Sequence, residues 1–221
     1  MKVCALLPLF LAVGFAAFVP VAAGAVKRVA FVFDDGPVPA DAGPLLELLT
    51  REKVRVTFAL VGDRVAEHPE TARAIVAAGH EVANHSQTHS HAREIDDAAL
   101  DREVAAAQQL FTRTTGVAPH WYWPPFLEID ERVRAAVKRG GITIYEPAQI
   151  VVTQDYDRKV DGAAIYRLAT TDVRDGAVIL CHEWRAETRE QLPAILQELR
   201  RQGCVFLTFS ELRAAMTERR S

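Results

Sequence analysis

The stretch that decides the fold is Val29-Ala30-Phe31-Val32-Phe33, which runs directly into Asp34-Asp35-Gly36-Pro37. Its apolar, β-branched and aromatic residues predict a buried strand. Two adjacent carboxylates stand where that strand ends. Taken alone, Asp-Asp-Gly-Pro is also a good turn, because aspartate caps, glycine permits a positive φ and proline stops the chain. The role of the two carboxylates therefore depends on what else reaches the same place.

Downstream, the chain alternates short apolar runs with amphipathic ones and shows no internal repeat or linker. Such alternation predicts a parallel sheet. The number of repeats predicts an α/β fold, a distorted and incomplete (β/α) barrel of seven or eight parallel strands, with an open doubly wound sheet as the alternative. We expect further strands at 54–61, 81–84, 121–123, 142–145, 150–153, 177–181 and 204–208, and helices at 44–52, 69–78, 96–115, 129–139, 163–170 and 189–202, with Ser210 capping a last helix.

A second segment, His85-Ser86-Gln87-Thr88-His89, places two imidazoles directly after the strand expected at 81–84. One carboxylate and two histidines form a ligand set for an open, catalytic divalent metal site. A spare carboxylate beside them suits a general base. His91 is expected to be a solvated neighbour, with a substitute ligand as the alternative. In parallel α/β folds, active sites form beyond the carboxyl ends of the strands, which favours one shared site for both segments.

Two further titratable residues follow expected strands and would join the same face. His182 is a candidate general acid, because the unperturbed pKa of imidazole is near neutral. Asp155 is a candidate partner that orients His182, or else only part of a loop. Glu183 is expected to be solvated, with a partner that orients His182 as the alternative.

Aromatic residues gather near the same ends of the chain's strands. Half of them should belong to the core, and the rest would form a flat apolar wall for a sugar ring. The group consists of Trp121, Tyr122, Trp123, Phe126 and Trp184.

The length and composition indicate an ordinary globular protein with one domain. It has 221 residues, of which 49% are hydrophobic and 25% charged, enough for one large core. The formal net charge of -3 gives no support to nucleic-acid binding. We expect a monomer with no nucleic-acid partner.

The N-terminus has the pattern of a secretory signal peptide. Lys2 precedes an apolar run that ends in the small residues Ala23-Gly24-Ala25. We expect cleavage after residues 1–25, which leaves a catalytic domain at 26–221 in the periplasm or outside the cell, with no stable membrane insertion. An uncleaved membrane anchor is the alternative, since the run is nearly long enough to span a bilayer.

The exported chain would keep two cysteines, Cys181 and Cys204. The first ends one expected strand and the second begins the next. In neighbouring parallel strands they would lie at opposite ends of the sheet, beyond the Cα separation of about 7 Å that a disulfide tolerates. We expect two free, buried thiols.

From Val29 to about Leu212, the chain resembles the polysaccharide deacetylases, a family of metal-dependent carbohydrate esterases. The stretch from Phe33 to Pro37 resembles the family's first motif, which implies that Asp34 is the catalytic base and Asp35 a metal ligand. The segment from His85 to His89 matches the second motif, His-Ser/Thr-x-x-His, whose two histidines are ligands. Leu180-Cys181-His182 matches the last motif, Leu-x-His, which carries the general acid.

The third motif departs from the family pattern. Where the family usually has Arg-Pro-Pro-Tyr-Gly, this chain has Trp123-Pro124-Pro125-Phe126-Leu127. In the family the arginine pairs with the catalytic aspartate, and tryptophan cannot form that charge pair. The fourth motif, usually an Asp-Trp loop, is Asp155-Tyr156 here.

The resemblance implies an exported deacetylase that uses zinc, or another divalent metal such as cobalt or nickel, to remove N- or O-acetyl groups from a glycan. Its substrate contacts would come from Trp123, Pro125, Phe126 and Trp184, with the Phe126 backbone N–H as oxyanion donor. Two other functions stay open. One is a related hydrolase of non-glycan amides. The other is a glycan-binding protein whose catalytic site has decayed.

Overall fold

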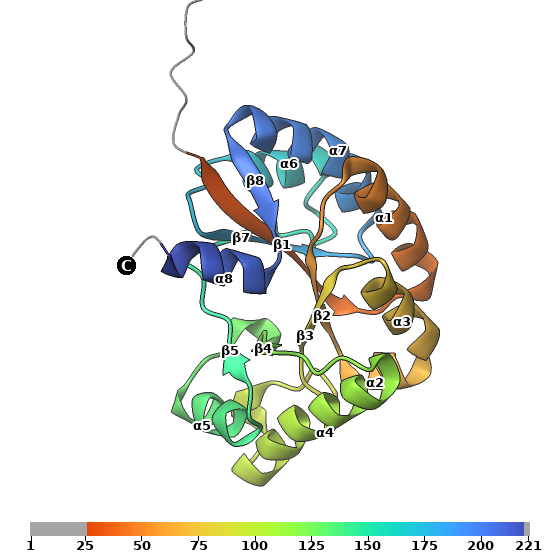
Figure 1. Cartoon of the computed structure of the whole chain (residues 1–221), viewed down its shortest axis with the longest axis vertical. Coiled ribbons are helices and arrows are strands. Elements are labelled where there is room, and N and C mark those ends of the chain that lie inside the picture. Colours follow the sequence, from red (N-terminus) through yellow and green to blue (C-terminus); the bar gives the residue numbers. More distant parts are fainter. Residues whose placement is uncertain (1–25, 219–221) are drawn as a thin grey trace, which may run out of the picture.

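Strand β1 (Lys27–Gly36) is the centre of a single sheet in the computed structural model, which describes residues 26–218 (Figure 1). Along one edge β1 pairs with β7 (Ala177–His182). Its other edge is shared, because β8 (Cys204–Leu207) pairs with the first half of β1 and β2 (Thr57–Leu60) with the second half. All of these pairings are parallel, as the sequence predicts.

The rest of the sheet extends from both sides of β1 in the order β5-β4-β3-β2-β1-β7-β6. Within the described residues no hydrogen-bonded ladder joins β5 to β6, so the curved sheet is an open half-barrel. The predicted incomplete (β/α) barrel is thus confirmed. The remaining strands are β3 (Glu81–Asn84), β4 (Trp121–Tyr122), β5 (Thr143–Ile144) and β6 (Gln149–Val152).

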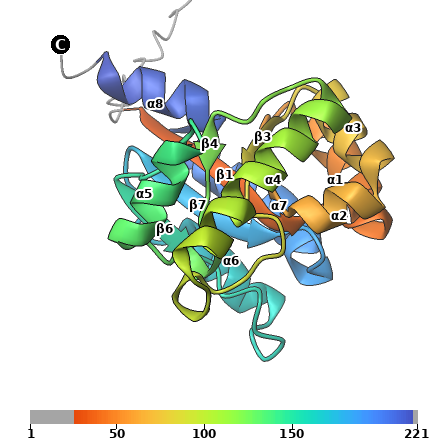
Figure 2. The ribbon, with the colours of Figure 1, turned by 90° about the horizontal axis from the view of Figure 1, so that it is seen from below.

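Helices follow most of the strands, and Figure 2 shows the first four gathered on one side of the sheet. The sequence missed α2, a helix too short to show a periodic pattern, and both one-turn helices. The helices are α1 (Pro39–Glu52), α2 (Gly62–Glu67), α3 (Pro69–Ala77), α4 (Asp97–Thr115), α5 (Glu131–Arg139), α6 (Gly162–Thr170), α7 (Ala186–Arg201) and α8 (Phe209–Thr217), with 3-10 turns η1 (Ala92–Glu94) and η2 (Pro125–Leu127).

The prediction that Ser210 caps the last helix is wrong. Thr208 is the N-cap of α8, and with Glu211 it forms a reciprocal capping box. Ser210 instead donates its hydroxyl to the Glu81 carboxylate on β3. The hydroxyl of Ser210 is thus engaged in a tertiary contact rather than in capping.

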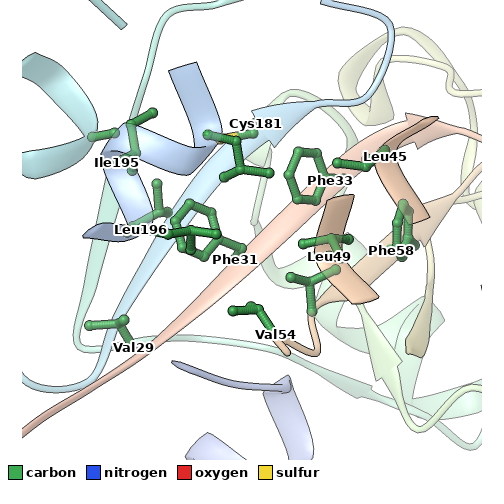
Figure 3. Close-up of a cluster of buried hydrophobic side chains, with 14 of the residues drawn as sticks. Val29, Phe31, Phe33, Leu45, Leu49, Val54, Phe58, Cys181, Ile195 and Leu196 are labelled. Atoms are coloured by element: carbon green, nitrogen blue, oxygen red, sulfur yellow. The ribbon is translucent and has the colours of Figure 1, made fainter. Parts of the chain in front are cut away.

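Side chains on β1 alternate between two cores, as the period of a strand requires. Val29, Phe31 and Phe33 belong to the outer core, between the sheet and helices α1 and α7 (Figure 3). Ala30 and Val32 belong to the inner core on the concave face. Asp34 is next in the inner series, so the strand itself directs this carboxylate toward the mouth of the half-barrel.

Strand β7 follows the same rule. Val178 and Leu180 lie in the inner core, and His182 continues the series. Asp34 and His182 are also register partners across the two strands. The pairing of β1 with β7 therefore places a carboxylate beside an imidazole without help from any loop.

Aromatic side chains fill much of the inner core of the half-barrel. Phe209, at the start of α8, stacks on Tyr145 with ring centroids 3.9 Å apart and lies 5.3 Å from Trp123. Helix α8 lies against the concave face of the sheet (Figure 1). This packing leaves the carboxyl ends of the strands as the place for chemistry.

Cys181 and Cys204 are both free and buried, as predicted. Their register partners on β1 are Phe33 and Lys27, six residues apart (33 minus 27). At about 3.3 Å per residue that separation is about 20 Å, far beyond disulfide reach.

The expected signal peptide, residues 1–25, lies outside the described residues and stays a prediction. Within residues 26–218, none of the helices has both the length and the apolar character needed to cross a bilayer.

Candidate metal and acid–base site

The site forms where β1, β3, β4, β6 and β7 end. Asp34 and Asp35 lie near the carboxyl end of β1. His85 follows β3, and His182 is the last residue of β7. Asp34, Asp35 and His182 converge on a pocket of about 480 Å³. It is lined by Asp34, Asp35, His89, Phe126, Leu127, Val152, Tyr156, Leu180 and His182.

Three predicted ligands form one compact group. Asp35 Oδ1 lies 3.0 Å from His89 Nε2 and 3.4 Å from His85 Nε2. Ligands about 2.0–2.2 Å from a tetrahedral metal lie roughly 3.3 Å apart, so the spacing fits a zinc-like ion. Burial works to raise the pKa of Asp35, but the adjacent imidazoles of His85 and His89 hold it below its usual range. The carboxylate is therefore ionised and available as a ligand.

The protonation of His85 also suits a metal. Its Nδ1 lies 2.5 Å from the backbone carbonyl of Trp123. Because a carbonyl can only accept, Nδ1 must carry a proton, and in the neutral imidazole Nε2 keeps its lone pair. This Nε2 is buried and has no hydrogen-bond partner within the described residues. An orphaned acceptor next to Asp35 is what a cation would satisfy.

Helix α4 holds the loop that carries the two histidines. The Glu103 carboxylate accepts hydrogen bonds from the backbone N–H groups of Gln87 and Thr88, at 3.0 and 2.8 Å. The N–H of His89 donates to Ser86 Oγ at 3.0 Å. Ser86 and His89 both have a positive φ, of 66° and 61°, and such backbone persists where surrounding contacts fix it. Sequence analysis missed Glu103, which looks like any charge on an amphipathic helix.

His182 is held between two carboxylates. Its Nδ1 lies 2.7 Å from Asp155 Oδ1, and its Nε2 lies 3.1 Å from Asp34 Oδ1. Asp155 is fully buried, and its other oxygen accepts hydrogen bonds from the His182 N–H and the Thr188 hydroxyl. Burial works to lower the pKa of His182, but the bond to Asp155 and the charge of Asp34 raise it to about 9. The imidazole is thus protonated near neutral pH, with Nε2 facing the pocket.

Asp34 has no cationic side chain of arginine or lysine beside it in the described chain; its ion-pair neighbours are His182 and His85. Burial raises the pKa of Asp34, and the charges of those two histidines oppose the rise. The indole Nε1–H of Trp123 donates a hydrogen bond to Asp34 Oδ2 at 3.3 Å. Where the family's arginine would supply charge, this chain supplies a neutral donor.

Two arginines that might substitute lie elsewhere. Arg64, on α2, donates to the backbone carbonyl of Asp35. Arg185 pairs with Glu187 at 2.9 Å and donates to the carbonyl of Val160. Neither forms an ion pair with Asp34.

The residues predicted to bind substrate occupy different environments. Trp123 is 1% exposed and Pro125 is buried, whereas Phe126 is 49% exposed beside His89, with ring centroids 4.6 Å apart. Trp184 is half-buried, 5.2 Å from the His182 ring. Tyr156, the second residue of the fourth motif, also lines the pocket and is 57% exposed, although it was not among the predicted substrate contacts.

His91 lies outside the ligand group. Its Nδ1 is 3.0 Å from the Glu128 carboxylate, and its ring stacks on Phe126. The metal-ligand geometry of the described residues therefore rests on His85 and His89 rather than on His91.

The expectation that Glu183 is solvated is wrong. The residue is fully buried, and its carboxylate accepts a hydrogen bond from the backbone N–H of Val38. Glutamate is rarely buried without a partner, so its residue type alone predicts an exposed position. The turn between β7 and α7 instead directs this side chain beneath the loop that follows β1.

Comparison with known proteins identifies the family of this chain. The model of the polysaccharide deacetylase family matches residues 22–145, more than half of the chain. The chain therefore belongs to the polysaccharide deacetylase family.

Among its relatives is a peptidoglycan-N-acetylglucosamine deacetylase from Bacillus cereus, 29% identical over 194 residues, covering 84% of this chain and 88% of that protein. The solved family 4 carbohydrate esterase from Streptomyces lividans, in complex with acetate, is 32% identical with a TM-score of 0.75, covering 81% of this chain and 91% of that one. Two other curated peptidoglycan deacetylases, from Listeria monocytogenes and Bacillus subtilis, are longer, and the match covers 39% and 40% of their length.

A third similar structure bears on catalytic competence. It is a mutant, with restored enzymatic activity, of a family 4 carbohydrate esterase pseudoenzyme from Bacillus anthracis. It is 25% identical with a TM-score of 0.78, covering 85% of this chain and 68% of that one. Membership of the family thus includes proteins described as inactive.

The ligand group predicts that metal content depends on His89 but not on His91. Elemental analysis of purified protein should find close to one divalent ion per chain in the wild type and in His91→Ala, and far less in His89→Ala, because one of three ligands is lost. Equal metal in His89→Ala and wild type would remove His89 from the site.

Proposed function

We propose that this chain is a metal-dependent hydrolase that removes acetyl groups from an acetylated glycan. The observation that carries the proposal is the position of the Asp35, His85 and His89 group directly beside the Asp34–His182–Asp155 array. One half of this arrangement can hold a divalent ion, and the other half can accept and donate protons. Hydrolysis of an acetyl group requires both.

The metal, held by Asp35, His85 and His89, would supply a Lewis acid that polarises the acetyl carbonyl and eases deprotonation of water. Asp34 is the base that accepts the proton of the attacking water. His182, protonated on Nε2, donates a proton to the leaving nitrogen or oxygen. Asp155 fixes the ring of His182 and stabilises its charged form. The Phe126 backbone N–H is the proposed donor to the oxyanion.

We infer zinc as the metal, because two imidazoles and one carboxylate are typical zinc ligands; cobalt and nickel suit the same donors. Two observations support an acetylated glycan as the substrate. A similar protein is a peptidoglycan deacetylase, and the aromatic rings of Phe126 and Tyr156 are exposed at the pocket. With the expected signal peptide, these features favour action outside the cytoplasm.

A second candidate function is glycan binding without catalysis. Two observations favour it: Trp123 stands where the family carries arginine, and a similar structure is derived from a pseudoenzyme. Against it, every other side chain that the family's mechanism uses is present, and these side chains meet within hydrogen-bonding or ligand distances.

The base in this mechanism predicts a specific loss in Asp34→Asn. Acetate release from chitin oligomers, peptidoglycan and acetyl-xylan should fall about 10²- to 10⁴-fold, because a positioned base contributes roughly that much. Metal content and glycan affinity should stay near wild type. Metal-depleted wild type should be inactive and should recover when metal is restored.

The same assay separates the two candidate functions. Wild-type protein that holds its metal and binds one of these glycans tightly, yet releases no acetate from any of them, would establish the binding protein and exclude the deacetylase.

The hydrogen bond from Trp123 predicts a pH effect. Asp34 must be ionised to act as base, so activity falls as the pH drops through its pKa. Trp123→Phe removes the N–H donor and keeps an aromatic ring at this position, so the pKa of Asp34 should rise and the acid limb of kcat/KM should move up by about one pH unit or less.

Trp121→Phe is the matched control, because that indole donates to Ser210 at 2.8 Å and not to Asp34. If the acid limb of Trp123→Phe coincides with that of wild type while activity drops, then Trp123 serves packing alone.

The bond from Asp155 predicts a shift at the other end of the pH range. His182 must be protonated to act as acid, so activity falls as the pH rises through its pKa of about 9. Asp155→Asn removes the charge that raises this pKa, and the basic limb should move down toward about 6.5. Asp157→Asn, an exposed neighbour, should leave the limb in place. An unmoved limb in Asp155→Asn would show that His182 is not the acid.

A further inference from the structure

The backbone of the metal-binding aspartate is strained. Asp35 has a φ of 64°, in the left-handed region that favours glycine. Such a conformation costs on the order of 1–3 kcal/mol and persists when its surroundings hold it. It also sets the direction of the carboxylate, which lies at ligand distance from two histidines. Some contact must therefore restrain the chain on both sides of Asp35.

One restraint comes from α2. The guanidinium of Arg64 donates a hydrogen bond to the backbone carbonyl of Asp35 itself. This contact fixes the peptide group that follows the aspartate, but it leaves the turn at residues 36–38 to be held by something else.

The second restraint is Glu183. Its carboxylate accepts the backbone N–H of Val38, three residues beyond Asp35. It also packs against Gly36 so tightly that a Cβ there would come within 2.5 Å of Glu183 Oε1. The turn is thus pressed against this carboxylate and bonded to it. Arg189 anchors the other side of Glu183 by donating to its backbone carbonyl at 2.5 Å.

Stability alone does not account for an acid at this position. Glu183 is fully buried, and its Oε2 has no hydrogen-bond partner among the described residues. A buried polar atom without a partner costs free energy. Burial, partly offset by the Val38 N–H, raises the pKa of Glu183 to about 7. Glu183 therefore lowers the stability of the fold, yet it contacts the turn that follows the proposed metal ligand Asp35. This combination suggests that the side chain has a role in the site.

We propose that Glu183 is a positioning residue, which clamps the turn Gly36-Pro37-Val38 and so keeps Asp35 aimed at the metal. It touches neither substrate nor metal and acts through the backbone. The inference rests on the proposed metal site, and it adds a residue that follows the general acid in sequence but serves the ligand on the neighbouring strand.

The test is zinc affinity, measured by competition with a chromophoric chelator on metal-stripped full-length protein. Glu183→Ala should bind Zn²⁺ about 10–100-fold more weakly, the usual effect of losing a partner that orients a ligand. Glu183→Gln should stay within about threefold of wild type, because its amide oxygen can still accept the Val38 N–H. Glu190→Ala, which changes an exposed residue of α7, should match wild type.

Thermal unfolding of the metal-free proteins separates positioning from folding. If Glu183→Ala does not fold, Glu183→Asp, which is one methylene too short to reach Val38, replaces it with the same expected loss. Zinc affinity equal to wild type in the folded Ala or Asp variant would overturn the proposal. So would an equal loss in Glu183→Gln, since the hydrogen bond would then not be what matters.

Hydrogen exchange of the backbone amides at residues 34–42 keeps this inference distinct from the proposed function. If wild type binds no Zn²⁺, the proposed function fails, and exchange alone decides the clamp. Faster exchange at Val38 in Glu183→Ala than in wild type and Glu183→Gln, by about tenfold or more, supports the clamp. Equal exchange in all three proteins would overturn it.

Discussion

The site depends on the parallel pairing of β1 with β7 in a register that sets Asp34 opposite His182. Each strand buries alternate side chains in the inner core, and each ends its inner series with a polar residue at the mouth of the half-barrel. A slip of one residue in this register would turn either group to the outer face. The outer core, built around Phe31 and Phe33, resists that slip because it would bring these rings into the crowded interior.

Much of this arrangement follows from the sequence, because it depends on local patterns. The apolar run at Val29 to Phe33 identifies β1, and parallel topology brings the polar residues at strand ends to one edge. The histidine pair and the Leu-x-His segment could be placed for the same reason. The contacts that hold those residues are different in kind. Glu103 and Glu183 are ordinary glutamates in sequence, and their roles arise from where α4 and the β7–α7 turn pack.

The two mispredicted residues share that cause. Ser210 and Glu183 were assigned by what their residue types usually do, a serine capping a helix and a glutamate facing water. In the fold, Ser210 meets the Glu81 carboxylate and Glu183 meets the amide of Val38. Both partners are more than a hundred residues away in the chain (210 minus 81, and 183 minus 38). No window of sequence contains such pairs, so local propensity gives way to tertiary contact.

In the family, one arginine of the third motif would supply both a hydrogen bond and a positive charge to the carboxylate. With Trp123 at that position, these two contributions come from different groups. An arginine beside a carboxylate provides a hydrogen bond and a positive charge together. Here Trp123 provides the hydrogen bond to Asp34, and its ring also fills the core against Phe209. Positive charge near Asp34 comes from His182, 3.1 Å away, and from His85. A metal ion held beside Asp35, as we propose, would add to it. Because Asp155 keeps His182 protonated, the ionised state of Asp34, the proposed base, depends on the partner of His182, the proposed acid. Acid and base are therefore coupled, and a change at Asp155 should be felt at Asp34.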